Sequence, residues 1–539
     1  MIRYNLLICF IMMMVALQAQ FINNGATVTI QPGAVLRIET DFDNQAGTID
    51  NQGVLEVQGN FNSVVGPGTT LSGNGKIKFF GTTNSNLSPG DDVLNKVELL
   101  KTTSTGTVTL TGAVTVNDSL IFGGSAGGST IILGANDLTL GATSTVTGAS
   151  QATGYVVTGS TGQMKKTNLG ATPFTYPVGF DAVTYNPVTI AENGTIDNIG
   201  VRVLQKAYAN GSSGTALTTS FVDATWSISD ATPGGNNLTI TPYWKGSDEV
   251  SFNRTLCRVA RYNGQKYDLD ASTKLPAGGS DPYSLQRSGI TNTGNFIVSS
   301  SSFVKVAPKL FLEGAYVVAD GLMRDVLRAN NKLPLAQPFG LLTFTGTYAA
   351  SLNSDEAVNQ SIFDVTGNNA VVDWVLLELR DNANRSIVHA RRAALLQRDG
   401  DIVDIDGVSP VRFDNISDGN YHLSVRHRVH LGTRTATSLS LSETSTPINF
   451  TNNANAIANS QKELVSVGSG IYGILTGDVD RDGRILSGDI VAIGGFFNTS
   501  LGNFNYFTRS TDADLDGRII SGDVVSTGSN INKQVNLNQ

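Results

Sequence analysis

Short runs of alternating apolar and polar residues extend from Phe21 to about Met164, separated by turns rich in Asn and Gly. Alternation with a period of two is typical of β-strands with one buried face. Between Thr102 and Met164 only Asp118 and Asp137 carry charge. Repeated, nearly uncharged coils bury their side chains against neighbouring coils. The pattern therefore predicts a parallel β-helix-like solenoid, with a hairpin-rich β-sandwich as the alternative.

After Lys165 the apolar runs lengthen, and their spacing becomes typical of a β-sandwich. A Ser-rich linker at 299–308 leads to a third segment of long strands, in which 321–335 is one of the few stretches with helical spacing. The predicted fold class is all-β and multidomain, with a small C-terminal α module. The predicted order is a signal peptide at 1–19, a β-helix-like repeat domain at 20–164, a β-sandwich domain at 165–304, a β-sandwich-like module at 309–450 and a small C-terminal module at 470–539.

The N-terminus has the residue order of a secretory signal peptide: Arg3, an apolar stretch from Leu6 to Leu17, and then the small residue Ala19. The apolar stretch is shorter than the roughly 20 residues that span a bilayer. We therefore expect a secreted protein, located in the extracellular space or at the outer-membrane surface. Cleavage after Ala19 leaves Cys257 as the single cysteine, which we interpret as a small buried hydrophobic residue.

The charge balance argues against two classes of partner. The chain has 37 basic and 45 acidic residues, a net charge of −8, and no run of basic side chains. Nucleic acids and anionic membranes attract basic surfaces, so neither is an expected partner.

Two twelve-residue segments carry the clearest chemistry: DVDRDGRILSGD begins at Asp478 and DADLDGRIISGD begins at Asp512. Each has Asp at positions 1, 3, 5 and 12 and Gly at position 6. Alternate aspartates on a curled loop direct their oxygens to one point, and calcium takes about six to eight oxygen ligands. The predicted ligands of two calcium ions are the side chains of Asp478, Asp480, Asp482, Asp489, Asp512, Asp514, Asp516 and Asp523, with the backbone carbonyls of Arg484 and Arg518.

The residues of the two loops, together called the tandem, also predict how the loops pair. Ile485 and Ile519, at position 8, fit the short strand pairing by which neighbouring loops of the EF-hand type support each other. Position 9 is apolar in both loops, Leu486 and Ile520, which argues against a water-mediated ligand there. We expect the tandem to fold as a unit that is loose in chelator, because clustered carboxylates repel one another without a cation.

The two loops resemble type I dockerins, the duplicated calcium modules that bind cohesin domains. The eight aspartates match the ligand positions of that motif. The resemblance implies that positions 10 and 11, Ser487-Gly488 and Ser521-Gly522, would contact a cohesin-like partner.

Two further segments resemble parts of Bacteroidetes surface proteins. INNGATVTIQPGAVL, IDNQGVLEVQGNF and LGANDLTLGATSTVTG are similar to the N-terminal solenoid of hemagglutinin- or adhesin-like members, which implies a stalk or an adhesive surface. DWVLLELRD, ARRAALLQRDGDIVDIDG and YHLSVRHRVHL resemble a module that precedes calcium repeats in proteins exported by the type IX system.

The candidates for catalysis are weak. On a strand, His422 and His427 would point to opposite faces, as would His427 and His430, so we expect all four histidines, including His389, at surface or edge positions rather than on zinc. The GGSAG string at 123–127 matches the G-x-S-x-G elbow without the strand-turn-helix context.

Two other clusters have structural interpretations. We interpret one acidic cluster as a hairpin with one solvent-exposed face: Asp399, Asp401, Asp404 and Asp406. The alternatives are a glycosidase carboxylate pair or a cation site. Trp226, Tyr243 and Trp244 read as core, with sugar stacking as the alternative.

The sequence predicts a non-catalytic, secreted or cell-surface calcium-binding protein for adhesion or structure, with a C-terminal module that docks or stabilises. The alternatives are a dockerin-bearing component that binds or degrades polysaccharide, and a subunit of an extracellular fibre. The expected cofactor is calcium, two ions; the candidate partners are a cohesin-like or other surface protein, a glycan, or a second copy of the chain.

Overall fold

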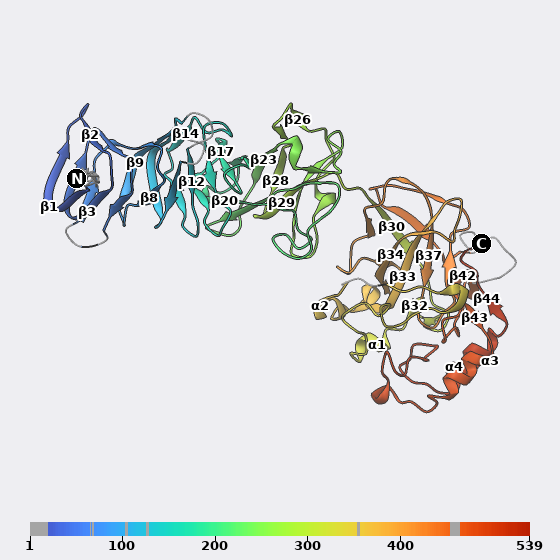
Figure 1. Ribbon diagram of the computed structural model, residues 1–539. Helices are drawn as coiled ribbons and strands as arrows, with labels where there is room; N and C mark the ends of the chain where they lie inside the picture. The colour runs from blue at the N-terminus through green and yellow to red at the C-terminus, as the bar shows by residue number, and fades with distance from the viewer. Residues whose placement is uncertain are drawn as a thin grey trace, which may run out of the picture. The chain divides into compact units, whose positions relative to one another are not determined.

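A computed structural model describes residues 20–64, 66, 69–102, 106–124, 129–352, 356–452 and 464–538 (Figure 1). The chain forms two compact units, Met1–Ser301 (unit 1) and Ser302–Gln539 (unit 2). The predicted signal peptide and the serine of the GGSAG string lie outside the described residues. The domain boundaries predicted within each unit stay a prediction.

Unit 1 begins with a parallel β-solenoid, which confirms the prediction from the repeated runs. Two sheets wind along it in parallel register. The first sheet contains β1 (Phe21–Ile30), β3 (Phe42–Asn51), β5 (Phe61–Ser63), β6 (Thr69–Ser72), β8 (Ser85–Ser88), β10 (Thr107–Leu110), β12 (Thr130–Ile132), β15 (Val156–Val157) and β18 (Val178–Gly179). The second begins with β2 (Val35–Ile38), β4 (Val54–Val57), β7 (Lys76–Gly81), β9 (Val93–Lys101), β11 (Val114–Phe122), β13 (Leu138–Leu140), β14 (Thr145–Thr147) and β16 (Met164–Leu169).

Identical side chains stack between successive coils of the solenoid. The ring of Phe42 lies 5.5 Å from that of Phe21 and 4.8 Å from that of Phe61. Two residues further along the strand, the Asn23 amide donates to Asn44 Oδ1 at 2.9 Å. In-register parallel pairing places equivalent residues above one another, so one repeated pattern builds both an apolar and a polar ladder.

The second solenoid sheet continues into antiparallel strands. β16 pairs in parallel with β13 and antiparallel with β20, so the open end of the coil is covered by the following strands. The added strands are β20 (Asp197–Leu204), β22 (Thr225–Asp230), β29 (Gly294–Ser299), β21 (Phe221–Val222), β24 (Glu249–Val250) and β25 (Arg258–Arg261). A separate sheet contains β17 (Phe174–Tyr176), β19 (Val188–Glu192), β23 (Leu238–Trp244), β28 (Arg287–Ile290), β27 (Tyr283–Ser284) and β26 (Gly278–Gly279).

The sequence left open the roles of four side chains of unit 1: Trp226, Tyr243, Trp244 and Cys257. Tyr243 is half-buried. Trp226 and Trp244 are fully buried, and their indole N–H groups donate to Asn186 O and Glu249 Oε1. This confirms the core interpretation and excludes sugar stacking by those two rings. Cys257 is a buried free cysteine, and burial raises the pKa of its thiol to about 11, as expected of a packing residue.

Unit 2 is built on a sheet of long antiparallel strands. Its strands are β33 (Val371–Asp381), β34 (Val388–Gln397), β35 (Ile402–Val403), β37 (Gly419–Arg426), β38 (Thr433–Arg434) and β39 (Leu439–Leu441). Smaller sheets contain β30 (Phe303–Lys309), β36 (Val411–Asp414) and β40 (Thr446–Asn449), the pair β31 (Tyr316–Val317) and β32 (Leu322–Met323), and the pair β41 (Leu464–Gly468) and β42 (Ile471–Ile474). The helical spacing at 321–335 yields only the short helix α1 (Val326–Ala329), and a second short helix is α2 (Gln360–Phe363).

The C-terminal repeats belong to the core of unit 2. They contain β43 (Arg484–Ile485), α3 (Ser487–Gly494), α4 (Ser521–Ser529) and β44 (Lys533–Gln534). Apolar side chains of the repeats join those of β33 and β34 in one buried cluster that extends from Val304 to Leu537. The expected small helical module is present, but it shares its core with the preceding β module instead of closing a core of its own. Among the described residues, no helix has the length and hydropathy to span a bilayer.

Candidate metal centre

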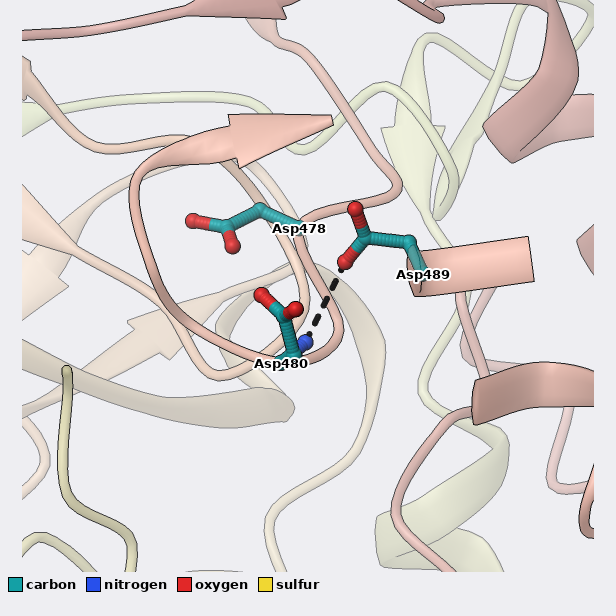
Figure 2. Close-up of side chains that lie close together, drawn as sticks. All are labelled: Asp478, Asp480 and Asp489. Atoms are coloured by element: carbon teal, nitrogen blue, oxygen red, sulfur yellow. Dashed lines mark hydrogen bonds between the residues drawn. The ribbon is translucent and has the colours of Figure 1, made fainter. Parts of the chain in front are cut away.

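The first loop brings three carboxylates together. Asp478, Asp480 and Asp489 each offer one oxygen, and these oxygens lie within 4.8 Å of one another (Figure 2). Asp478 and Asp480 project from the curled chain before β43, and Asp489 lies in the first turn of α3. The carboxylates of the loop and of the helix thus converge on one point, as their spacing within the twelve-residue segment predicts.

Backbone hydrogen bonds hold the first loop in its curl. The Asp478 carboxylate accepts from the N–H groups of Asp482 and Gly483 at 3.0 and 3.2 Å. The Asp489 carboxylate accepts from Val479 and Leu486, which ties the start of the loop to its end. Gly483 has φ +83°, the left-handed region that side-chain-bearing residues avoid. The glycine at position 6 is therefore required by the backbone, as the motif predicts.

The second loop repeats the backbone hydrogen bonds 34 residues later, but its convergent set has the aspartate of position 5 in place of that of position 12. Oxygens of Asp512, Asp514 and Asp516 lie within 4.8 Å of one another. The Asp512 carboxylate accepts from the N–H groups of Asp516 and Gly517 at 3.1 and 2.8 Å, and Gly517 has φ +77°. The Asp523 carboxylate accepts from Ala513 and Ile520. Equal hydrogen bonds in two loops of the same pattern show that the pattern itself dictates the conformation.

Some predicted ligands lie outside these convergent sets. Asp482 and Asp523 each accept a backbone N–H within their loops, from Arg484 and Ile520, but they do not join the three oxygens of their own loop. Arg484 and Arg518 hold position 7, as the sequence requires. Ligation by these residues stays a prediction.

The electrostatics of both loops favour an added cation. Burial, followed by repulsion from neighbouring aspartates, raises the pKa of Asp478 well above its usual range. Burial likewise raises the pKa of Asp489 and of Asp523 to about 6. Carboxylates held this close destabilise one another when ionised, and a hard divalent cation relieves the repulsion. The all-oxygen donor set therefore fits calcium.

The expected pairing between the two loops is wrong. Ile485 of β43 pairs with Lys533 of β44, and Ile519 forms a bridge with Thr499. Thr499 and Lys533 are equivalent positions, 34 residues apart, each following the helix of its repeat. Position 8 of each loop therefore pairs with the segment after the helix of the other repeat. The exchange is reciprocal, and α3 packs against α4.

A half-buried glutamate of the β module, Glu313, anchors the repeats. Glu313 accepts from the N–H of Thr476 at 2.9 Å and from the side-chain amide of Asn530 at 2.6 Å, so it contacts the segments before the first loop and after the second helix. The Thr476 hydroxyl donates to the carbonyl of Ala513 in the second loop. One glutamate thus ties both repeats to the module before them.

A second anchor starts at Asp373 on β33. Its carboxylate accepts from Arg428 Nε at 2.9 Å and from the Tyr506 hydroxyl at 2.6 Å. Arg428, which is fully buried, donates onward to Ser510 O at 2.7 Å, two residues before the second loop. Sequence reasoning missed these contacts, since their partners are 55 to 133 residues apart in the chain.

The prediction of surface positions is wrong for three histidines. His422, His427 and His430 are buried, and the Nδ1 atoms of His427 and His430 lie 3.0 Å apart. β37 ends at Arg426, so residues 427–430 do not follow strand alternation, and the two rings meet. His389 is partly exposed beside Asp381, as expected. Burial lowers the pKa of His430 well below its usual value, which keeps the ring neutral.

The acidic cluster near residue 400 differs from the predicted solvent-exposed face at one position. Asp404 is fully buried and contacts Arg392 at 2.5 Å, whereas Asp401 is exposed and pairs with Lys309 at 3.0 Å. Among the described residues, these aspartates do not form a convergent group of three metal ligands.

Comparisons with known proteins add little. No protein-family model and no curated protein matches the chain. Two solved structures are similar: an N-terminal and a C-terminal interface mutant of a type II cohesin-X-dockerin complex from Acetivibrio cellulolyticus. They share 16% and 17% sequence identity, with TM-scores of 0.17 and 0.18, and each match covers 30% of this chain and 81% of the other. Scores at this level do not establish a shared fold.

Proposed function

We propose that unit 2 binds two calcium ions and that the chain is a non-catalytic, secreted or cell-surface protein for adhesion or assembly, stabilised by calcium. The observation that carries the proposal is the pair of loops that converge carboxylates with the same backbone hydrogen bonds. The proposed ligands are the side chains of Asp478, Asp480, Asp482, Asp489, Asp512, Asp514, Asp516 and Asp523, with the carbonyls of Arg484 and Arg518.

Calorimetric titration of the full chain with calcium tests the proposal. Two ions per chain are expected, and the double variant Asp480→Asn/Asp514→Asn is expected to lose most of the binding. Asp401→Asn removes an exposed carboxylate of the other acidic cluster in the same unit and serves as the control. Absence of heat, together with an unchanged melting curve, would refute calcium binding. Release of reducing ends from a polysaccharide by the purified chain would refute the non-catalytic part.

A docking role is supported by the surface of the two helices. Val491 on α3 and Val525 on α4 are 74% and 70% exposed and occupy the same position of the two repeats. α3 packs against α4, and exposed apolar side chains that form one continuous patch are typical of a protein-binding surface. We propose that this face receives a cohesin-like protein when calcium holds the helices in place.

Binding of purified cohesin domains, measured with calcium and with chelator, tests the docking role. Val491→Lys/Val525→Lys is expected to abolish calcium-dependent binding by placing two charges in the interface. Val408→Lys is the control, because Val408 is 82% exposed in unit 2 but lies outside the repeats. Binding that survives the double variant would contradict this surface.

A further inference from the structure

The two loops have the same aspartates but different basic neighbours. Asp514 forms an ion pair with Arg324, whose Nη1 lies 3.5 Å from Asp514 Oδ2. Asp480 has the same position in the first loop, and among the described residues it has no ion pair. The second loop therefore holds one of its proposed ligands in an interaction that the first loop lacks.

Arg324 is anchored by its backbone, and its side chain is partly exposed. It follows β32, and its N–H donates to Ala315 O at 2.9 Å. Its side chain is 32% exposed and that of Asp514 is 21% exposed, so water reaches the pair. The guanidinium can leave Asp514 for solvent without unfolding its own segment.

A second positive charge acts on the same loop. The buried guanidinium of Arg428 donates to Ser510 O at 2.7 Å, two residues before Asp512. The first loop has Arg481 at position 4, which attracts Asp480, but its guanidinium donates to the carbonyls of Thr343 and Val479. Among the described residues, an ion pair at position 3 is therefore found in the second loop and not in the first.

We infer that Arg324 competes with calcium for Asp514 and makes the second loop the weaker, later-filled site. The inference rests on the proposed calcium binding. A cation that uses Asp514 has to displace the guanidinium and then bind beside its positive charge, whereas a cation that uses Asp480 breaks no ion pair among the described residues. At intermediate calcium concentrations the first loop is filled and the second is held closed by Arg324. The chain thereby responds in two steps to rising calcium.

Calorimetric titration of the full chain with calcium chloride at low ionic strength tests the inference. The wild type is expected to show two constants; Asp514→Asn removes the weaker site and Asp480→Asn the tighter one. A partly exposed ion pair of this kind is worth at most about a fivefold change in affinity, so Arg324→Gln is expected to tighten the weaker site by roughly two- to fivefold. Arg324→Lys keeps the charge and is expected to retain the wild-type constants.

Lys309→Gln is the control, because it removes the same charge from another, more exposed ion pair of unit 2, Lys309–Asp401. It is expected to change neither constant. Raised salt is expected to bring the two wild-type constants closer together, a measurement that needs no variant. Equal constants in the wild type, or an Arg324→Gln variant that melts normally and binds as the wild type does, would overturn the inference but leave calcium binding intact. Absence of binding by the wild type would instead remove the proposed function and the inference together.

Discussion

Calcium is expected to stabilise all of unit 2 and not only the repeats. The buried cluster that runs from Val304 to Leu537, with the anchors at Glu313 and Asp373, places both loops in the same folded unit as the long β-sheet. Loss of the loops would expose the sheet's own apolar face, so loops and sheet should unfold together. Removal of calcium distinguishes the two possibilities: either loops and sheet unfold together, or the repeats unfold as an independent module.

The size of the effect follows from mass action. A site filled at a calcium concentration 100 times its dissociation constant stabilises the folded state by about 2.7 kcal/mol. Because both sites belong to one unit, their contributions add to about 5 kcal/mol. In a domain of 150 to 250 residues, 1 kcal/mol shifts the melting temperature by about 2–4 °C. Calcium should therefore raise the melting temperature of unit 2 by roughly 10–20 °C.

The three tryptophans provide the assay, since Trp226 and Trp244 lie in unit 1 and Trp374 lies on β33 in unit 2. Trp374 is fully buried, and its indole donates to Pro334 O at 2.9 Å. In a Trp226→Phe/Trp244→Phe chain, thermal unfolding followed by fluorescence reports on the sheet of unit 2 alone. The contradicting result is a melting temperature that calcium shifts in the helical circular dichroism signal but not in Trp374 fluorescence. That result would refute the conclusion that the repeats and the sheet share one core.

Three further results are expected. Gly483→Ala should destabilise unit 2 by about 2–5 kcal/mol in urea unfolding, from left-handed backbone strain and a new Cβ 2.8 Å from the Tyr348 ring. Gly517→Ala should do so by only about 1–2 kcal/mol, because its new Cβ meets the end of a flexible leucine; equal losses would contradict this. Burial raises the pKa of Asp489 and Asp523 to about 6, so the calcium-free unit should lose stability as pH rises from about 4 to 6. Calcium affinity should fall below pH 6, because the two carboxylates become protonated. A melting temperature in chelator that does not change with pH would contradict this expectation. The repeats expressed alone should melt less cooperatively than the full chain, and an equally sharp transition would show that they fold independently.

The local sequence pattern was enough to predict the elements whose contacts are made by residues close together in the chain. The solenoid follows from in-register repetition, which stacks Phe21, Phe42 and Phe61 without any distant partner. The loops follow from aspartates and a glycine at fixed spacing, because their hydrogen bonds close within twelve residues. The weak apolar pattern after Asp523 nevertheless forms α4, since packing against α3 supplies what the helix lacks.

Only the tertiary structure decided the contacts between distant segments. His427 and His430 meet because β37 ends before them, and Ile485 pairs with Lys533 because the repeats exchange segments. The Arg324–Asp514 ion pair joins residues 190 positions apart, and no spacing rule reaches that far. Hydrophobic periodicity and loop motifs report on short-range geometry, whereas the charges around each aspartate loop depend on which surfaces the whole core brings together.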